Sequence, residues 1–98
     1  MLYAMTVRRL KPGTYEDYLN AWELEAPPAG WTRICTVRSV ENEDEVVSFG
    51  FFDGSMEDLR RSQEQFDYAG QRARVEEFVE STGTDGIFEV TMEMEGRP

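Results

Sequence analysis

Two six-residue stretches of the chain repeat each other, and each has the pattern of a junction between a strand and a helix. They are Gly13-Thr14-Tyr15-Glu16-Asp17-Tyr18 and Gly54-Ser55-Met56-Glu57-Asp58-Leu59. In each, the Thr or Ser hydroxyl is suited to N-cap a helix, and the acidic pair complements the positive end of the helix dipole. Each stretch follows a run rich in β-forming residues and precedes apolar residues at helical spacing. The repeat therefore predicts two βα units.

Strands are expected in four places outside these junctions. Residues 2–10 alternate in polarity, and the β-rich runs 31–40 and 45–52 flank a short polar turn that predicts an antiparallel hairpin. The last strand is expected over residues 87–94, where apolar and polar side chains alternate again.

Helices are expected over residues 14–24 and, as one long helix, over residues 55–81. Gly70 lies inside the second of these, where a glycine costs about 1 kcal/mol relative to alanine. We therefore expect a kink, a break into two helices or a close packing contact at that position.

The order of these elements, βαββαβ, predicts a ferredoxin-like α+β fold. Right-handed crossovers place both helices on one face of a four-stranded antiparallel sheet with strand order 4-1-3-2. At 98 residues, the chain is expected to form a single domain over residues 1–98, with residues 95–98 as a frayed tail.

One face of such a sheet is left uncovered by the helices. We expect it to carry Ala4, Thr6, Arg8, Ser48, Gly50, Phe52, Ile87, Glu89 and Thr91, with either Ile34, Thr36 and Arg38 or the opposite set from the second strand. Packing on a second copy would bury its apolar residues at about 25 cal/mol per Å² of apolar area. A homodimer through this face is therefore the expected assembly.

The composition excludes several classes of function. The 20 acidic residues outnumber the 10 basic ones, and a net charge of −10 argues against nucleic acid and anionic membranes as partners. Histidine is absent, so the commonest nitrogen ligand is missing, and we expect no metal site and no bound cofactor. Cys35 is the only cysteine, which fits a reducing cytoplasm. With no histidine to activate it, Cys35 is expected to be a small buried residue rather than a nucleophile.

The centre of the chain, residues 30–39 and 46–59, resembles antibiotic-biosynthesis-monooxygenase-type domains of the dimeric α/β-barrel superfamily. The resemblance rests on three features: Gly30-Trp31 leading into the second strand, Arg38-Ser39 near its end, and the entry Phe52-Asp53-Gly54-Ser55 into the second helix. It implies a homodimer with a cavity between sheet and helices in each protomer.

The superfamily includes cofactor-independent oxygenases and haem-degrading enzymes. Haem-degrading relatives use a histidine on the second helix, which this chain lacks, and the tryptophan familiar near the end of the third strand is here Phe51 or Phe52. The resemblance therefore implies a cofactor-independent monooxygenase-like protein acting on a small aromatic molecule, without a transferable catalytic set. The alternative is a non-enzymatic module for small-ligand binding or dimerisation.

Seven residues are candidates for ligand binding: Arg8, Trp22, Arg38, Phe52, Tyr68, Arg72 and Glu89. Arg8 and Glu89 are expected on neighbouring strands, as a cross-strand ion pair or as a pair that orients a ligand. Trp22 is spaced for core packing or for an aromatic wall. Tyr68 and Arg72, four residues apart, belong either to a pocket mouth or to a solvated helix surface.

Overall fold

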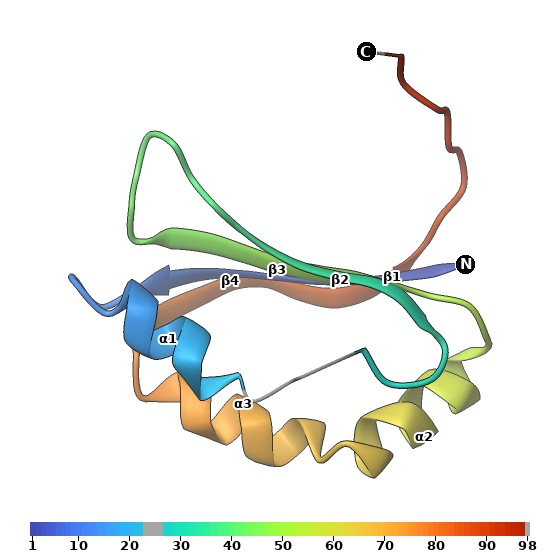
Figure 1. Ribbon diagram of the computed structural model, residues 1–98, viewed down its shortest axis with the longest axis horizontal. Coiled ribbons are helices and arrows are strands. Elements are labelled where there is room, and N and C mark those ends of the chain that lie inside the picture. Colours follow the sequence, from blue (N-terminus) through green and yellow to red (C-terminus); the bar gives the residue numbers. More distant parts are fainter. Residues whose placement is uncertain (23–26, 98) are drawn as a thin grey trace.

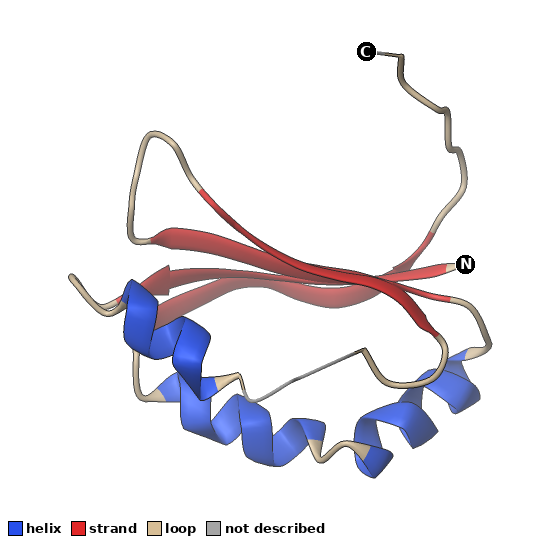
Figure 2. Cartoon of the chain, viewed as in Figure 1, coloured by secondary structure: helices blue, strands red, loops and turns tan. Residues whose placement is uncertain are grey.

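The computed structural model describes residues 1–22 and 27–97, and its topology is the predicted one (Figures 1 and 2). In chain order the elements are β1 (Leu2–Leu10), α1 (Tyr15–Ala21), β2 (Trp31–Arg38), β3 (Glu45–Phe52), α2 (Met56–Gln65), α3 (Tyr68–Glu76) and β4 (Val79–Glu89). The strands form an antiparallel sheet in the order β2-β3-β1-β4, which is 4-1-3-2 read from the other edge. The ferredoxin-like α+β fold is thus confirmed. The expected end of the first helix, at residue 24, lies outside the described residues.

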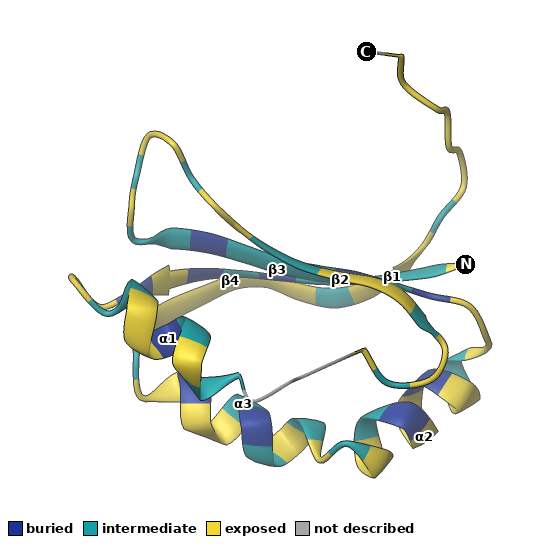
Figure 3. Ribbon diagram, in the orientation of Figure 1, coloured by how far each residue is buried: buried dark blue, intermediate teal, exposed yellow. Residues whose placement is uncertain are grey.

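All three helices lie on the same side of the sheet, and the last described residues, 90–97, lead away from its other side (Figure 1). Figure 3 shows that buried positions on the helices turn toward the sheet. The main core cluster comprises Leu10, Tyr18, Val46 and Val75, from β1, α1, β3 and α3. None of the helices within residues 1–22 and 27–97 is long and apolar enough to cross a membrane.

The two repeated junctions differ in how their helices begin. The Asp58 amide donates to the Ser55 hydroxyl at 3.1 Å, and the Ser55 amide donates to the Asp58 carboxylate at 3.1 Å, which completes a capping box. Thr14 precedes α1, but its hydroxyl donates to the Lys11 carbonyl at 2.7 Å and makes no capping bond. The predicted hydroxyl cap is confirmed at Ser55 and wrong at Thr14, because only Ser55 has the extended backbone that aims an N-cap side chain at the helix.

The helix expected over residues 55–81 is broken into α2 and α3 at Asp67. Asp67 has a left-handed backbone (φ +52°), and its carboxylate accepts from the Gly70 amide at 3.2 Å. A Cβ at Gly70 would collide with that carboxylate, so the glycine permits the cap. The predicted break is confirmed, but the turn lies three residues before the glycine.

The final strand begins earlier and ends earlier than predicted. We expected helix to residue 81 and strand over 87–94, whereas α3 ends at Glu76 and β4 runs from Val79 to Glu89. The segment 81–86 contains two glycines, which made it look like a turn, yet it pairs with β1 through two register shifts. Hydrogen bonding to β1 outweighed the local turn signal. Beyond β4 the Val90 amide donates to the Met1 carbonyl at 3.0 Å, and residues 90–94 are not part of a strand.

The two faces of the sheet are the reverse of those predicted. Thr6, Arg8 and Phe52, expected on the uncovered face, are buried on the side of the helices. Other residues expected on the uncovered face, including Ser48, Gly50 and Ile34, also lie on the side of the helices. Thr91 lies beyond the end of β4. Alternation determines which residues share a face but not which face is covered.

Candidate ligand cavity

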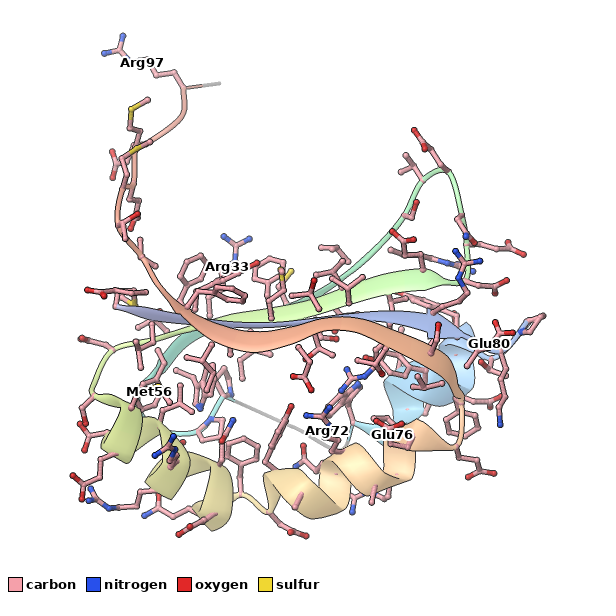
Figure 4. The ribbon with its side chains drawn as sticks, turned by 180° about the vertical axis from the view of Figure 1, so that it is seen from behind. Arg33, Met56, Arg72, Glu76, Glu80 and Arg97 are labelled. Atoms are coloured by element: carbon pink, nitrogen blue, oxygen red, sulfur yellow. The ribbon has the colours of Figure 1, made fainter. Side chains whose placement is uncertain are left out.

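A cavity of about 570 Å³ lies between the covered face of the sheet and the helices, within the size range of small-molecule sites. The strands contribute Ala4, Met5, Thr6, Arg8, Trp31, Ile34, Thr36, Ser48, Phe49, Gly50, Asp85, Gly86 and Ile87, and the helices and their ends contribute Leu19, Trp22, Gln63, Phe66, Tyr68, Gln71 and Arg72. In Figure 4, Arg72 reaches from α3 toward the sheet, whereas Arg33 points away from the opposite face.

Aromatic side chains form much of the cavity wall. The rings of Trp22 and Tyr68 stack with centroids 6.5 Å apart, and Phe66 meets Tyr68 nearly edge-on at 6.0 Å. Trp31, across the cavity on β2, donates its indole N–H to the Ser62 hydroxyl at 3.2 Å. Gly50 makes room for Trp31, since a Cβ there would lie 2.8 Å from the indole ring. Such walls suit a flat, largely apolar molecule.

Arg8 is the buried charge of this cavity, with 1% of its surface exposed. Its Nη1 donates to the Tyr18 hydroxyl at 2.9 Å, and that hydroxyl is 3.0 Å from Ser48 Oγ. The guanidinium also lies 5.9 Å and 5.6 Å from the ring centroids of Tyr18 and Trp22. Because an arginine keeps its charge in proteins, the site holds a fixed positive charge beside aromatic rings.

Arg72 carries the second positive charge, and acidic neighbours balance it. Its guanidinium forms an ion pair with Asp85 and lies 3.9 Å from Glu76. The hydrogen bond to Asp85 is the main reason why the pKa of Arg72 is raised above its ordinary value. Arg72 is therefore held in place by the wall itself, whereas Arg8 has no carboxylate partner among the described residues.

Four of the seven predicted candidates line this one cavity: Arg8, Trp22, Tyr68 and Arg72. Their elements are β1, the end of α1, and α3. For Tyr68 and Arg72 the geometry matches the pocket alternative. Trp22 fits both of its alternatives, because it packs against the core and also faces the cavity.

The other three candidates lie elsewhere. Phe52 is buried behind Trp31, with ring centroids 5.2 Å apart, and so supports the wall without lining it. Arg38 lies over the Tyr15 ring at 4.2 Å and donates to a carbonyl of the β2–β3 turn. Glu89 is opposite Leu2, whereas Arg8 is opposite Thr82, so the expected pair of Arg8 and Glu89 is wrong. Because β4 starts early, Glu89 lies at its last position, six residues along β1 from Arg8.

Sequence reasoning missed Trp31, Phe66 and Gln71 as cavity residues. The sequence could have pointed to Gln71, because positions 68, 71, 72 and 75 share one helical face. A glutamine on the face that packs against the sheet is a buried polar group and therefore a candidate for ligand binding. Trp31 stood at the start of a predicted strand, but only the bulge between Trp31 and Arg33 turns its indole toward α2. That bulge has no local sequence signature.

Comparison with known proteins gives structural neighbours only. No protein-family model matches the chain, and no curated protein matches it. A candidate antibiotic biosynthesis monooxygenase from Chloroflexus aurantiacus J-10-fl superposes with a TM-score of 0.76 at 14% identity, over 98% of each chain. A second one, from Nitrosomonas europaea, gives 0.76 at 16% identity, over 94% of this chain and 100% of the other.

A variant of SnoaB, a cofactor-independent oxygenase from Streptomyces nogalater, gives a TM-score of 0.74 at 13% identity, over 97% of each chain. At such identities these likenesses establish a shared fold and nothing finer. The chain therefore has the ferredoxin-like fold of structures described as antibiotic biosynthesis monooxygenases.

Proposed function

We propose that this protein binds a small aromatic molecule in its cavity and oxidises it in the manner of a cofactor-independent monooxygenase. The observation that carries the proposal is the cavity itself, in which the aromatic rings of Trp22, Trp31 and Tyr68 surround a space that also holds the buried Arg8. The neighbours described as monooxygenases, among them the cofactor-independent oxygenase SnoaB, support the same reading.

The side chains of the cavity can assist such a reaction in two ways. Aromatic walls orient a flat ring by stacking, and a fixed positive charge stabilises negative charge that develops on an oxygen of the substrate. An electron-rich substrate can then itself reduce O₂. One oxygen atom enters the substrate and the other leaves as water, with all electrons drawn from the substrate.

The alternative is a module that binds the same kind of molecule without turning it over. It is favoured by the lack of a free general base: the cavity lining that the structure describes has a single carboxylate, that of Asp85, which is bonded to Arg72. The chain also has no histidine. Deprotonation would then depend on the acidity of the substrate alone.

Oxygen uptake with a panel of quinol-like aromatics, paired with binding assays under anaerobic conditions, separates these readings. Both tryptophans of the chain line the cavity, so intrinsic fluorescence reports binding directly. Binding with oxygen uptake supports the oxygenase, binding without uptake supports the module, and no binding overturns both. Tyr68→Ala should weaken binding, whereas Tyr3→Ala, an equal truncation on the opposite face of the sheet, should not.

We also propose that the protein is a homodimer through the uncovered face of the sheet. Tyr3, Phe49, Phe51 and Phe88 form an aromatic cluster there, which we call the aromatic face, with Tyr3 at 5.1–6.4 Å from the other three ring centroids. Phe88 is 45% exposed, and the other three rings are half-buried. An aromatic cluster on a sheet face that no helix covers is typical of interaction sites. Light scattering should give twice the 11.3 kDa chain mass, and a monomer would contradict the proposal.

A further inference from the structure

The Arg8 guanidinium uses one of its two hydrogen-bonding edges and leaves the other empty. Nη1 donates to the Tyr18 hydroxyl at 2.9 Å. Nε and Nη2 are both buried and have no hydrogen-bond partner among the described residues. Buried polar atoms are almost all bonded, and unpaired donors on a charged group are costly, so the empty edge indicates a missing partner.

The two empty positions form a fork. In a guanidinium the Nε–H and the adjacent Nη2–H point in nearly the same direction, and their spacing matches the two oxygens of a carboxylate. We propose that the ligand of this cavity is an aromatic carboxylate, and that its carboxylate group binds side-on to Nε and Nη2 of Arg8. The proposal rests on the aromatic-ligand function proposed above and names the ligand class for that site.

The charges around the cavity favour one negative charge on the ligand. Among the described lining residues the positive charges are those of Arg8 and Arg72, and the carboxylate of Asp85 is bonded to Arg72. One unopposed charge therefore remains, at Arg8. A carboxylate balances it, whereas a doubly charged phosphate would bring a second negative charge into an aromatic wall.

Two further polar atoms are buried and unbonded in the described wall: Trp22 Nε1 and Gln71 Oε1. The Gln71 oxygen is an acceptor, so a hydroxyl on the ligand ring would find a hydrogen-bond partner there. The Trp22 ring centroid lies 5.6 Å from the Arg8 guanidinium. A carboxylate arriving at the empty edge must therefore contact or displace the indole, which makes Trp22 a reporter.

The test compares hydroxynaphthoate with its neutral methyl ester and with naphthyl phosphate. Trp22 and Trp31 both line the cavity and are both kept, and titrations of their fluorescence give dissociation constants. A charge-assisted pair should make the acid bind about 10- to 100-fold more tightly than the ester. In Arg8→Gln that preference should vanish while ester binding remains. Arg33→Gln, which removes a charge from the opposite face (Figure 4), should keep the preference.

The outcomes separate this proposal from the function on which it rests. Equal binding of acid and ester, or tighter binding of the phosphate, overturns the carboxylate site and leaves the aromatic cavity standing. If none of the three binds, the aromatic function falls as well. Should Arg8→Gln fail to fold, the arginine Nε–H resonances of the otherwise intact protein decide: the acid must shift one buried signal that the ester does not, and no such shift overturns the proposal.

Discussion

The two faces of the sheet differ in what they carry, and the face under the helices combines a polar network with the apolar core residues Leu10, Val46 and Phe52. The face under the helices carries Arg8, Thr36 and Ser48, which bond to one another through Tyr18 or directly. The face without helices carries the aromatic cluster of Tyr3, Phe49, Phe51 and Phe88.

The polar network under the helices and the aromatic cluster on the uncovered face indicate that each face is adapted to something outside the single chain. Polar groups under the helices are useful only if the space beside them holds a polar ligand, and aromatic groups in the open are stable only if another surface covers them. The covered face therefore belongs to the proposed ligand and the uncovered face to the proposed dimer. Substitutions matched across the two faces test that division.

The largest effect is expected from Phe51→Glu on the aromatic face. A charge at the centre of a dimer contact should cost at least about 2 kcal/mol of association free energy, or about a 30-fold rise in the dissociation constant. Sedimentation should show a shift toward 11.3 kDa. Ala73→Glu adds the same charge to an exposed position of α3 and should leave the mass unchanged. If both variants behave alike, the aromatic face is not the interface.

The next effect is expected from Tyr18→Phe under the helices. It removes the hydroxyl that bonds Arg8 at 2.9 Å and contacts Ser48 at 3.0 Å, so the free energy of unfolding should fall by about 1.5–3 kcal/mol. Urea denaturation measures the loss. Tyr3→Phe deletes the same atom on the other face, where its hydrogen bond within the described part of the chain is to the Met5 sulfur, and should change stability by less than about 0.5 kcal/mol. Equal losses would show that the polar network adds nothing.

Gly50→Ala should have a smaller effect, confined to the covered face. The new Cβ would lie 2.8 Å from the Trp31 ring and force it to move, a cost partly offset by the better strand propensity of alanine. We expect a net loss of about 1 kcal/mol and weaker ligand binding. The control is Gly83→Ala, whose Cβ meets its nearest neighbour at an ordinary 3.7 Å. Unchanged ligand affinity in Gly50→Ala would remove Trp31 from the site.

The smallest effect concerns how α2 is held over the covered face as pH changes. Hydrogen bonds from the Ser55 amide and hydroxyl lower the pKa of Asp58 from its ordinary value. Because the folded-state pKa is the lower one, the stabilisation is complete above the unfolded-state pKa and is lost as pH falls through the folded-state pKa. The difference in urea midpoint between the wild type and Asp58→Asn should therefore be constant near neutral pH and shrink below about pH 4. A difference that grows on acidification would contradict this assignment.

Prediction from sequence succeeded where the signal was local. The Ser55 N-cap, the hairpin of β2 and β3 and the break near Gly70, which was one of three expected alternatives, are each encoded within a few residues. The helical spacing that joins Tyr68 to Arg72 placed both on the cavity wall. Prediction from sequence failed at β4, where pairing with β1 overrode the turn signal of two glycines. The predicted contact between Arg8 and Glu89 was wrong for the same reason.

The sequence by itself determined the order of the elements, the strand order and the sets of residues that share a face, because these follow from periodicity, capping and the handedness of crossovers. Only the tertiary structure decided which set lies under the helices, since alternation is symmetric between the two faces of a sheet. That choice buried Arg8 beside Tyr18 and Trp22 and left the aromatic face without helices. The β2 bulge and the β4 register shifts likewise arise from pairing between distant segments, which local sequence does not specify.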